Sequence, residues 1–121
     1  MNKSQKEYLR HIMLLPRKLS VAICRAEEGG FWAKILELPG CNTQGEDFLD
    51  LVAMVNDAVF TWFNVPQKMR KALGYYMPQI PEELRKKIEA DARHAKIEEV
   101  VGHIIKGKKI LRFSNAGLSS S

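Results

Sequence analysis

The sequence is poor in the residues that build reactive or metal-binding centres. It has two cysteines, Cys24 and Cys41, among 121 residues, too few for a disulfide framework or a cysteine-based zinc site. The three histidines, His11, His94 and His103, lie far apart and lack metal-binding spacing such as HExxH. No nucleophile stands beside a suitable base. We therefore expect no enzyme activity, no bound metal and no cofactor.

Long apolar runs are missing as well. No stretch of about 18 apolar residues occurs, so we expect no transmembrane helix, and the run Ile12–Leu15 is too short for a secretory signal. The few cysteines favour a reduced, cytoplasmic setting, with Cys24 and Cys41 as buried thiols facing each other across neighbouring strands. The 45% hydrophobic and 27% charged residues are typical of one globular domain, or of a small domain with an appendage.

The net charge of +5 is unevenly distributed. Residues 1–64 contain seven basic and eight acidic residues, whereas residues 65–121 contain twelve basic and six acidic ones. The positive excess therefore belongs to the second half of the chain. Such a half would attract a phosphate backbone or an acidic partner, although a solvated helix surface explains the same pattern.

The first half is predicted to form a compact sheet. Residues 1–17 read as a polar arm or a short helix ending at Leu15-Pro16. Alternating apolar residues predict a strand over 19–25, and the glycine-containing loop 26–30 predicts a hairpin. The return strand covers 31–38 and ends at Pro39-Gly40. Residues 41–44 are long enough for a third short strand.

A helix is predicted to follow Gly45 and to end near Asn64, before Pro66. Acidic residues in its first turns suit the helix dipole, and its apolar face is expected to pack against a sheet. That face consists of Phe48, Leu51, Val52, Val55, Val59 and Trp62. Residues 18–65 should therefore form an α+β core, a small antiparallel sheet covered by one helix. The open sheet edges favour pairing with a second chain, as a homo-oligomer, dimer or tetramer.

Residues 66–113 are predicted to be a basic, helical C-terminal region. A short helix over 66–74 and an extended segment over 75–80 precede two amphipathic helices within 81–107. Lys108–Phe113 reads as a basic, extended tail, and residues 114–121 as a flexible one.

The segment from Leu19 to Asn64 strongly resembles the HicB antitoxin family of HicA–HicB toxin–antitoxin systems. The shared pattern is a strand, an acidic-glycine hairpin, an aromatic strand, a Leu-Pro-Gly-Cys turn and a Thr-x-Gly-acidic step into a helix. In this chain the pieces are Glu27-Glu28-Gly29-Gly30, Phe31–Ile35, Leu38-Pro39-Gly40-Cys41 and Thr43-Gln44-Gly45-Glu46.

The resemblance implies a truncated ribonuclease-H-like fold without the metal-binding carboxylates of the true enzymes. It also implies a function, to bind and neutralise a small basic mRNA-cleaving toxin by covering its RNA-binding surface. We expect the interface to include Glu27, Glu28, Phe31, Trp32 and Glu37, with the carboxylates facing the basic toxin.

Many family members also bind their own operator through a C-terminal module. Residues 79–84 followed by two helices look like a ribbon-helix-helix element, although Pro78 interrupts the ribbon and an oligomerisation element is the alternative. In the alternative function, a stand-alone DNA-binding regulator, the phosphate contacts would be Arg85, Lys86, Lys87 and Lys109. A third reading, a ribonuclease-H-like enzyme, would require Glu37, Glu46 and Asp50 to converge on a magnesium ion.

Overall fold

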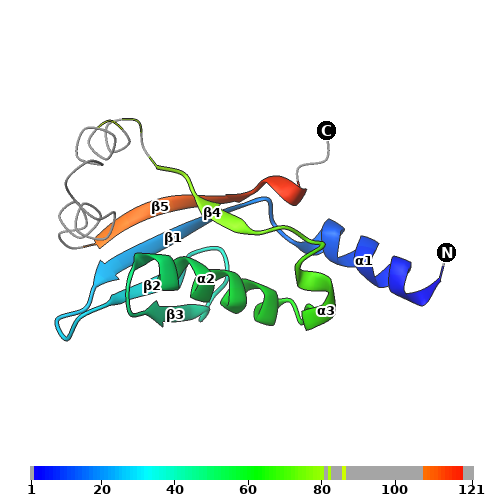
Figure 1. Cartoon of the computed structure of the whole chain (residues 1–121), viewed down its shortest axis with the longest axis horizontal. Coiled ribbons are helices and arrows are strands. Elements are labelled where there is room, and N and C mark those ends of the chain that lie inside the picture. The colour runs from blue at the N-terminus through cyan, green and yellow to red at the C-terminus, as the bar shows by residue number, and fades with distance from the viewer. Residues whose placement is uncertain (1, 81, 83–85, 87–107, 119–121) are drawn as a thin grey trace.

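The structure is a computed structural model that describes residues 2–80, 82, 86 and 108–118. The helices and strands are α1 (Lys3–Leu14), β1 (Lys18–Arg25), β2 (Phe31–Ile35), β3 (Asn42–Gly45), α2 (Phe48–Trp62), α3 (Gln67–Arg70), β4 (Tyr76–Pro78), β5 (Lys108–Asn115) and the 3₁₀ turn η1 (Ala116–Leu118). The strands form one antiparallel sheet in the order β3-β2-β1-β5-β4. The predicted α+β class is confirmed. Figure 1 shows α2 lying across one face of this sheet, with α1 extending beyond its end.

The core lies between α2 and the sheet face that alternating residues present to it. In β1 these residues are Leu19, Val21 and Ile23, all fully buried, and Phe31, Ala33 and Ile35 continue the same face in β2. Since successive side chains of a strand point to opposite faces, the residues between them face away from α2. The hydrophobic effect on this one face is therefore what holds the helix to the sheet.

Helix α2 begins and ends where its sequence indicates. The Asp47 side chain caps it by accepting a 2.7 Å hydrogen bond from the Asp50 backbone N–H, which satisfies one of the free donors of the first turn. At the other end Asn64 adopts a left-handed conformation with φ of 56°, which asparagine tolerates better than most residues. The helix predicted after Gly45 is thus confirmed.

Strand β5 is an interior strand of the sheet, between the central β1 and the edge strand β4. It pairs with β1 from Lys18↔Ser114 to Cys24↔Lys108, and β4 pairs with its other side. The predicted helical region 66–113 is therefore wrong at its end, because residues 108–113 belong to the core sheet. Within the same region, helix α3 and the extended segment at β4 are confirmed, while the two helices predicted within 81–107 lie outside the described residues.

The end of the chain is also more ordered than predicted. Asn115, placed in the flexible tail 114–121, is buried, and its side-chain amide donates to the Leu73 carbonyl at 3.1 Å. Leu118 belongs to the hydrophobic core. The prediction of a flexible tail is therefore wrong for residues 114–118, because pairing with β1 and packing of Leu118 hold them.

Within the predicted arm 1–17, Lys3–Leu14 form helix α1, one of the two predicted alternatives. Its N-terminus has a capping box, in which the Asn2 and Gln5 side chains each accept from the other's backbone N–H. Tyr8 and Ile12 pack against the core, and the Tyr8 hydroxyl donates to the Ala72 carbonyl at 3.2 Å. The arm is therefore attached near α3.

The two cysteines do not face each other. Cys24 lies opposite Trp32, whereas the Cys41 carbonyl accepts from the Ile35 N–H at the other end of β2. The predicted proximity is wrong because Cys41 precedes β3 and lies where the β2–β3 connection begins. Both thiols are free, and burial raises the pKa of Cys41.

The buried Tyr76 is expected to make the free energy of unfolding depend on pH in the alkaline range. Its ring is fully buried, its hydroxyl donates to the Pro16 carbonyl, and burial raises the pKa of Tyr76 well above its ordinary value near 10.0. Below about pH 10 the folded and unfolded chains both keep the proton; above it only the unfolded chain releases it. We therefore expect this residue to lower the free energy of unfolding by about 1.4 kcal/mol for each further pH unit.

Urea titrations at about pH 9 to 11 measure this dependence. The Tyr76→Phe variant should lose this contribution while keeping the part due to Tyr75 and Cys41, whose pKa values burial also raises. An identical alkaline slope in the wild type and the variant would contradict the assignment.

Candidate functional site

The strongest candidate site is an open hollow at one end of the sheet, with a volume of about 660 Å³. Three elements meet there: the β1–β2 turn, the paired ends of β2 and β3, and the first turns of α2. Its lining comprises Ala26, Glu27, Glu28, Gly29, Phe31, Trp32, Gln44, Gly45, Glu46, Asp50 and Met54. We call it the acidic hollow, because four of these residues carry carboxylates and none is basic.

Glycines let the backbone close around this hollow. The Ala26 N–H donates to the Gly30 carbonyl, and the Gly29 N–H donates back to the Ala26 carbonyl. Gly29 and Gly30 have φ values of 103° and 81°, which residues with a Cβ adopt at a cost. A Cβ on Gly30 would lie 2.6 Å from the Gly45 carbonyl oxygen. The turn and the end of β3 thus approach too closely for larger residues.

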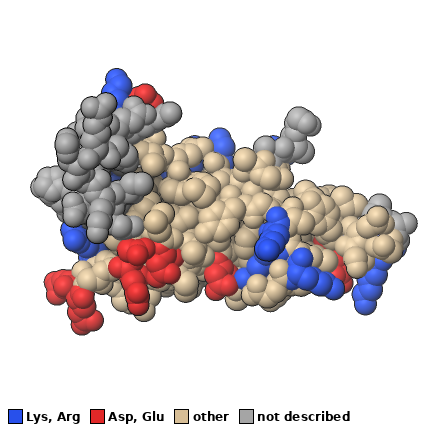
Figure 2. Space-filling model, viewed as in Figure 1, with Lys and Arg blue, Asp and Glu red and all other residues tan. Residues whose placement is uncertain are grey.

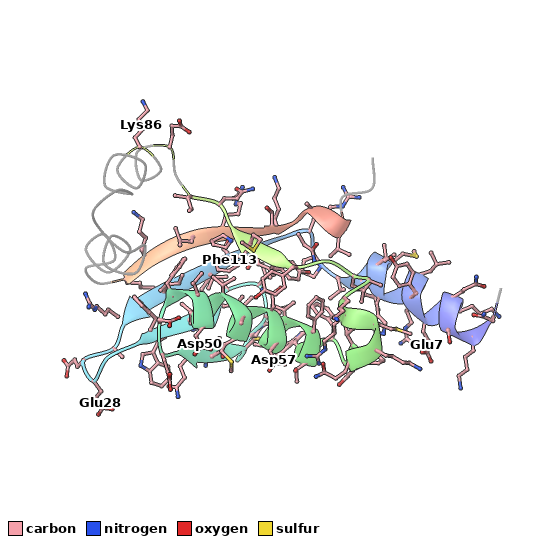
Figure 3. The ribbon with its side chains drawn as sticks, viewed as in Figure 1. Glu7, Glu28, Asp50, Asp57, Lys86 and Phe113 are labelled. Atoms are coloured by element: carbon pink, nitrogen blue, oxygen red, sulfur yellow. The ribbon has the colours of Figure 1, made fainter. Side chains whose placement is uncertain are left out.

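The four carboxylates come from two segments. Glu27 and Glu28 are exposed in the β1–β2 turn, and Figure 3 shows Glu28 and Asp50 at the same end of the molecule. Asp50 accepts a 2.9 Å hydrogen bond from the Glu46 backbone N–H, which orients it beside the start of α2. Figure 2 shows these acidic side chains gathered over the turn and the helix start. Their combined negative charge suits a cationic ligand or a basic protein surface.

The structure separates the five predicted toxin contacts into three groups. Glu27, Glu28 and Trp32 lie together at the hollow, and Trp32 is 53% exposed. Phe31 forms part of the floor but is only 6% exposed, since its ring packs edge-on against Phe48 with centroids 6.3 Å apart. Phe31 therefore has little surface to offer a partner, whereas the pleat directs the neighbouring Trp32 outward.

Glu37 does not line the hollow. Both of its carboxylate oxygens accept from the Ser20 backbone N–H, at 2.7 and 2.9 Å. Ser20 lies opposite the end of β2, where the ladder has stopped, so Glu37 supplies the acceptor that a longer β2 would have offered. Its role in the structure is to complete the β1–β2 pairing.

The four predicted DNA contacts are not brought together in the described part of the chain. Arg85 and Lys87 lie outside it, and Lys86 is exposed. Lys109, predicted to lie in a basic, extended tail, lies on β5 and pairs with Ile23 on the face of the sheet that α2 covers. Lys109 is therefore a strand residue of the core sheet.

Within residues 2–80, 82, 86 and 108–118, no three histidine, cysteine or acidic side chains gather closely enough to hold a metal ion. Glu37 is held at Ser20, whereas Glu46 and Asp50 lie at the opposite end of β2. These three carboxylates therefore do not converge as a magnesium-dependent enzyme would require. No helix among the described residues is long and apolar enough to cross a bilayer.

Two acidic members of the hollow, Glu46 and Asp50, were predicted from sequence to be helix-start residues and, in the enzymatic reading, magnesium ligands, but not contacts of a toxin. Glu46 and Asp50 do suit the dipole of α2, but they also face the β1–β2 turn. The sequence held one sign that the β1–β2 turn lies close to the end of β3. Gly30 and Gly45 stand at these two places, and glycine often marks a close approach of two backbones. Comparisons with protein-family models, curated proteins and solved structures found no match to this chain.

Proposed function

We propose that this protein is an antitoxin of the HicB type, which binds a small basic HicA-like toxin and covers its RNA-cleaving surface. The observation that carries the proposal is the acidic hollow, whose lining combines Glu27, Glu28, Glu46 and Asp50 with an exposed Trp32 and contains no basic residue. A carboxylate cluster beside an exposed aromatic side chain is suited to a basic protein surface, where tryptophan often supplies much of the binding energy.

The residues of the resemblance support the proposal by forming the local structures it implies. The Cys41 N–H donates to the Leu38 carbonyl at 2.9 Å across the Pro39-Gly40 turn, and Gly40 has a φ of 80°. Gly45 then leads from β3 to the Asp47 cap of α2. The finer assignment to a truncated ribonuclease-H-like fold belongs to this proposal.

Binding is expected to depend on charge at the turn. The double variant Glu27→Lys/Glu28→Lys should weaken the complex with a basic toxin by about 100-fold, because it places like charges opposite each other. The measurement uses a small basic HicA-like protein, which the proposal expects the neighbouring gene to encode, titrated with the antitoxin by calorimetry. RNA cleavage by that protein should return when the variant replaces the wild type.

The matched control is Glu7→Lys, which makes the same kind of charge change on α1, at the opposite end of the molecule (Figure 3). It should leave the affinity within about twofold. If both variants weakened toxin binding equally, the change in net charge, and not the acidic hollow, would explain the loss. No inhibition of the neighbouring protein by the wild type would defeat the antitoxin proposal itself.

The remaining functional predictions are unchanged. Operator binding and autorepression stay predictions, since the two helices predicted within 81–107 lie outside the described residues. A cytoplasmic setting and a dimer or tetramer also stay predictions. DNA contacts by Arg85 and Lys87 belong to the same group.

A further inference from the structure

The sheet has a second face, turned away from α2, which we call the open face. Residues paired across neighbouring strands have side chains on the same face, so the register defines its membership. Four successive rows run across it: Lys108, Cys24, Trp32 and Gln44; then Ile110, Ala22, Lys34 and Asn42; then Arg112 and Ser20; then Met77, Ser114 and Lys18.

Each of these rows contains one cation and no carboxylate. The cations are Lys108, Lys34, Arg112 and Lys18, all exposed. Consecutive rows are two residues apart along a strand, which places them about 7 Å from each other. The nearby Glu37 carboxylate is engaged by the Ser20 backbone at the end of the β1–β2 ladder. Each step of two residues along the strand direction therefore meets one positive charge, which lies on β5 in the first and third rows, on β2 in the second and on β1 in the fourth.

Large apolar side chains lie between these cations. Trp32, Ile110 and Met77 are 53%, 57% and 54% exposed. Trp32 shares the first row with Lys108, and Ile110 shares the second with Lys34. An exposed indole among cations is the arrangement on which bases of a single strand stack while the phosphates meet lysine and arginine.

A second copy of the chain would be repelled, because face-to-face packing would bring the four cations of each copy together. An acidic polypeptide would satisfy the charges, but it has no need of a regular spacing or of an exposed indole. We propose that the open face binds single-stranded nucleic acid, with the backbone along Lys108, Lys34, Arg112 and Lys18 and a base on Trp32. Trp32 also lines the acidic hollow, so the two surfaces meet at this side chain, whereas the four cations and the four carboxylates belong to separate groups of residues.

The test uses the full chain and a fluorescein-labelled oligothymidylate or oligouridylate of about twelve nucleotides, followed by fluorescence anisotropy. The triple variant Lys34→Gln/Lys108→Gln/Arg112→Gln should weaken binding at least about tenfold at about 50 mM salt. It should also reduce the slope of log K against log salt by about 2, since each lost phosphate contact removes about 0.7. The Trp32→Ala variant should weaken binding by about tenfold with little change of slope.

The matched control is Lys3→Gln/Lys6→Gln/Lys68→Gln, which removes the same charge from exposed positions of α1 and α3. Circular dichroism confirms that each variant is folded. An equal loss in the control would show nonspecific attraction and overturn the proposal. Equal affinity for a duplex of the same length would also overturn it, because paired bases cannot stack on Trp32.

Polyglutamate of matched charge tests the acidic-polypeptide alternative. It should compete only weakly with the oligonucleotide. Tight binding of polyglutamate that the open-face triple variant abolishes, combined with an unaffected Trp32→Ala variant, would assign the face to an acidic protein and refute nucleic-acid binding. The double variant Glu27→Lys/Glu28→Lys separates the two functions, because it should weaken toxin binding by about 100-fold and leave oligonucleotide binding intact or stronger.

Discussion

Replacing Asn56 with leucine is expected to lower the free energy of unfolding by about 3 kcal/mol. Asn56 is 3% exposed within α2, and its side chain pairs with the backbone of Tyr76 in both directions. The amide nitrogen donates to the Tyr76 carbonyl at 2.8 Å, and the amide oxygen accepts from the Tyr76 N–H at 2.6 Å. The amide nitrogen also donates to the Val52 carbonyl at 2.9 Å.

The expected loss of unfolding free energy comes from backbone groups that would lose their hydrogen-bond partner. Leucine has nearly the shape of asparagine but cannot form hydrogen bonds, so the buried N–H and carbonyl of Tyr76 would lose their partners. Because β4 is a short edge strand of three residues, this pairing is its main attachment to α2. We therefore expect β4 to detach before the rest of the sheet unfolds, with faster hydrogen exchange at Tyr76 and Met77.

Urea unfolding followed by circular dichroism measures the loss, and hydrogen exchange locates it. The control is Asn42→Leu, which makes the same exchange at an exposed position of β3 and should change stability by no more than about 0.5 kcal/mol. Equal stability of the Asn56→Leu variant and the wild type would show that water replaces the lost contacts and that the pairing is not structural.

Replacing Gly45 with alanine is expected to destabilise the fold by about 3 kcal/mol, at the upper end for overpacked sites. A Cβ at this position would lie 2.5 Å from the Leu51 backbone nitrogen and 2.6 Å from its Cα. These are backbone atoms in the first turns of α2, which cannot rotate away. The helix would have to separate from β3, opening the acidic hollow at its base.

Thermal and urea unfolding test the Gly45 prediction, with Gly40→Ala as the matched control. Gly40 has a positive φ of 80° but nothing within 4 Å of an added Cβ, so alanine there should cost only about 1 kcal/mol of backbone strain. If Gly45→Ala proved no more damaging than Gly40→Ala, the close approach of β3 and α2 would be refuted. In a stable Gly45→Ala variant, toxin affinity would reveal whether the hollow keeps its shape.

The elements whose cause is local were predictable from the sequence. The alternation of Leu19, Val21 and Ile23 defines β1, and Asp47 and Asn64 mark the ends of α2, because period and capping depend on neighbours a few residues away. The glycine loop between β1 and β2 was predictable for the same reason. Four residues of the hollow's lining, Glu27, Glu28, Phe31 and Trp32, were predicted as toxin contacts through the family resemblance.

The sequence by itself therefore determined the α+β class, the first hairpin and the helix that covers it. Only the tertiary structure decided that β5 lies inside the sheet, between β1 and β4, since Ser114 pairs with Lys18 across most of the chain and no local pattern specifies that partner. It also decided that Phe31 turns inward and Trp32 outward, which depends on the side from which α2 covers the sheet. The open face has a cation in each of its rows only because β5 lies beside β1, which brings Lys108 and Arg112 level with Cys24 and Ser20.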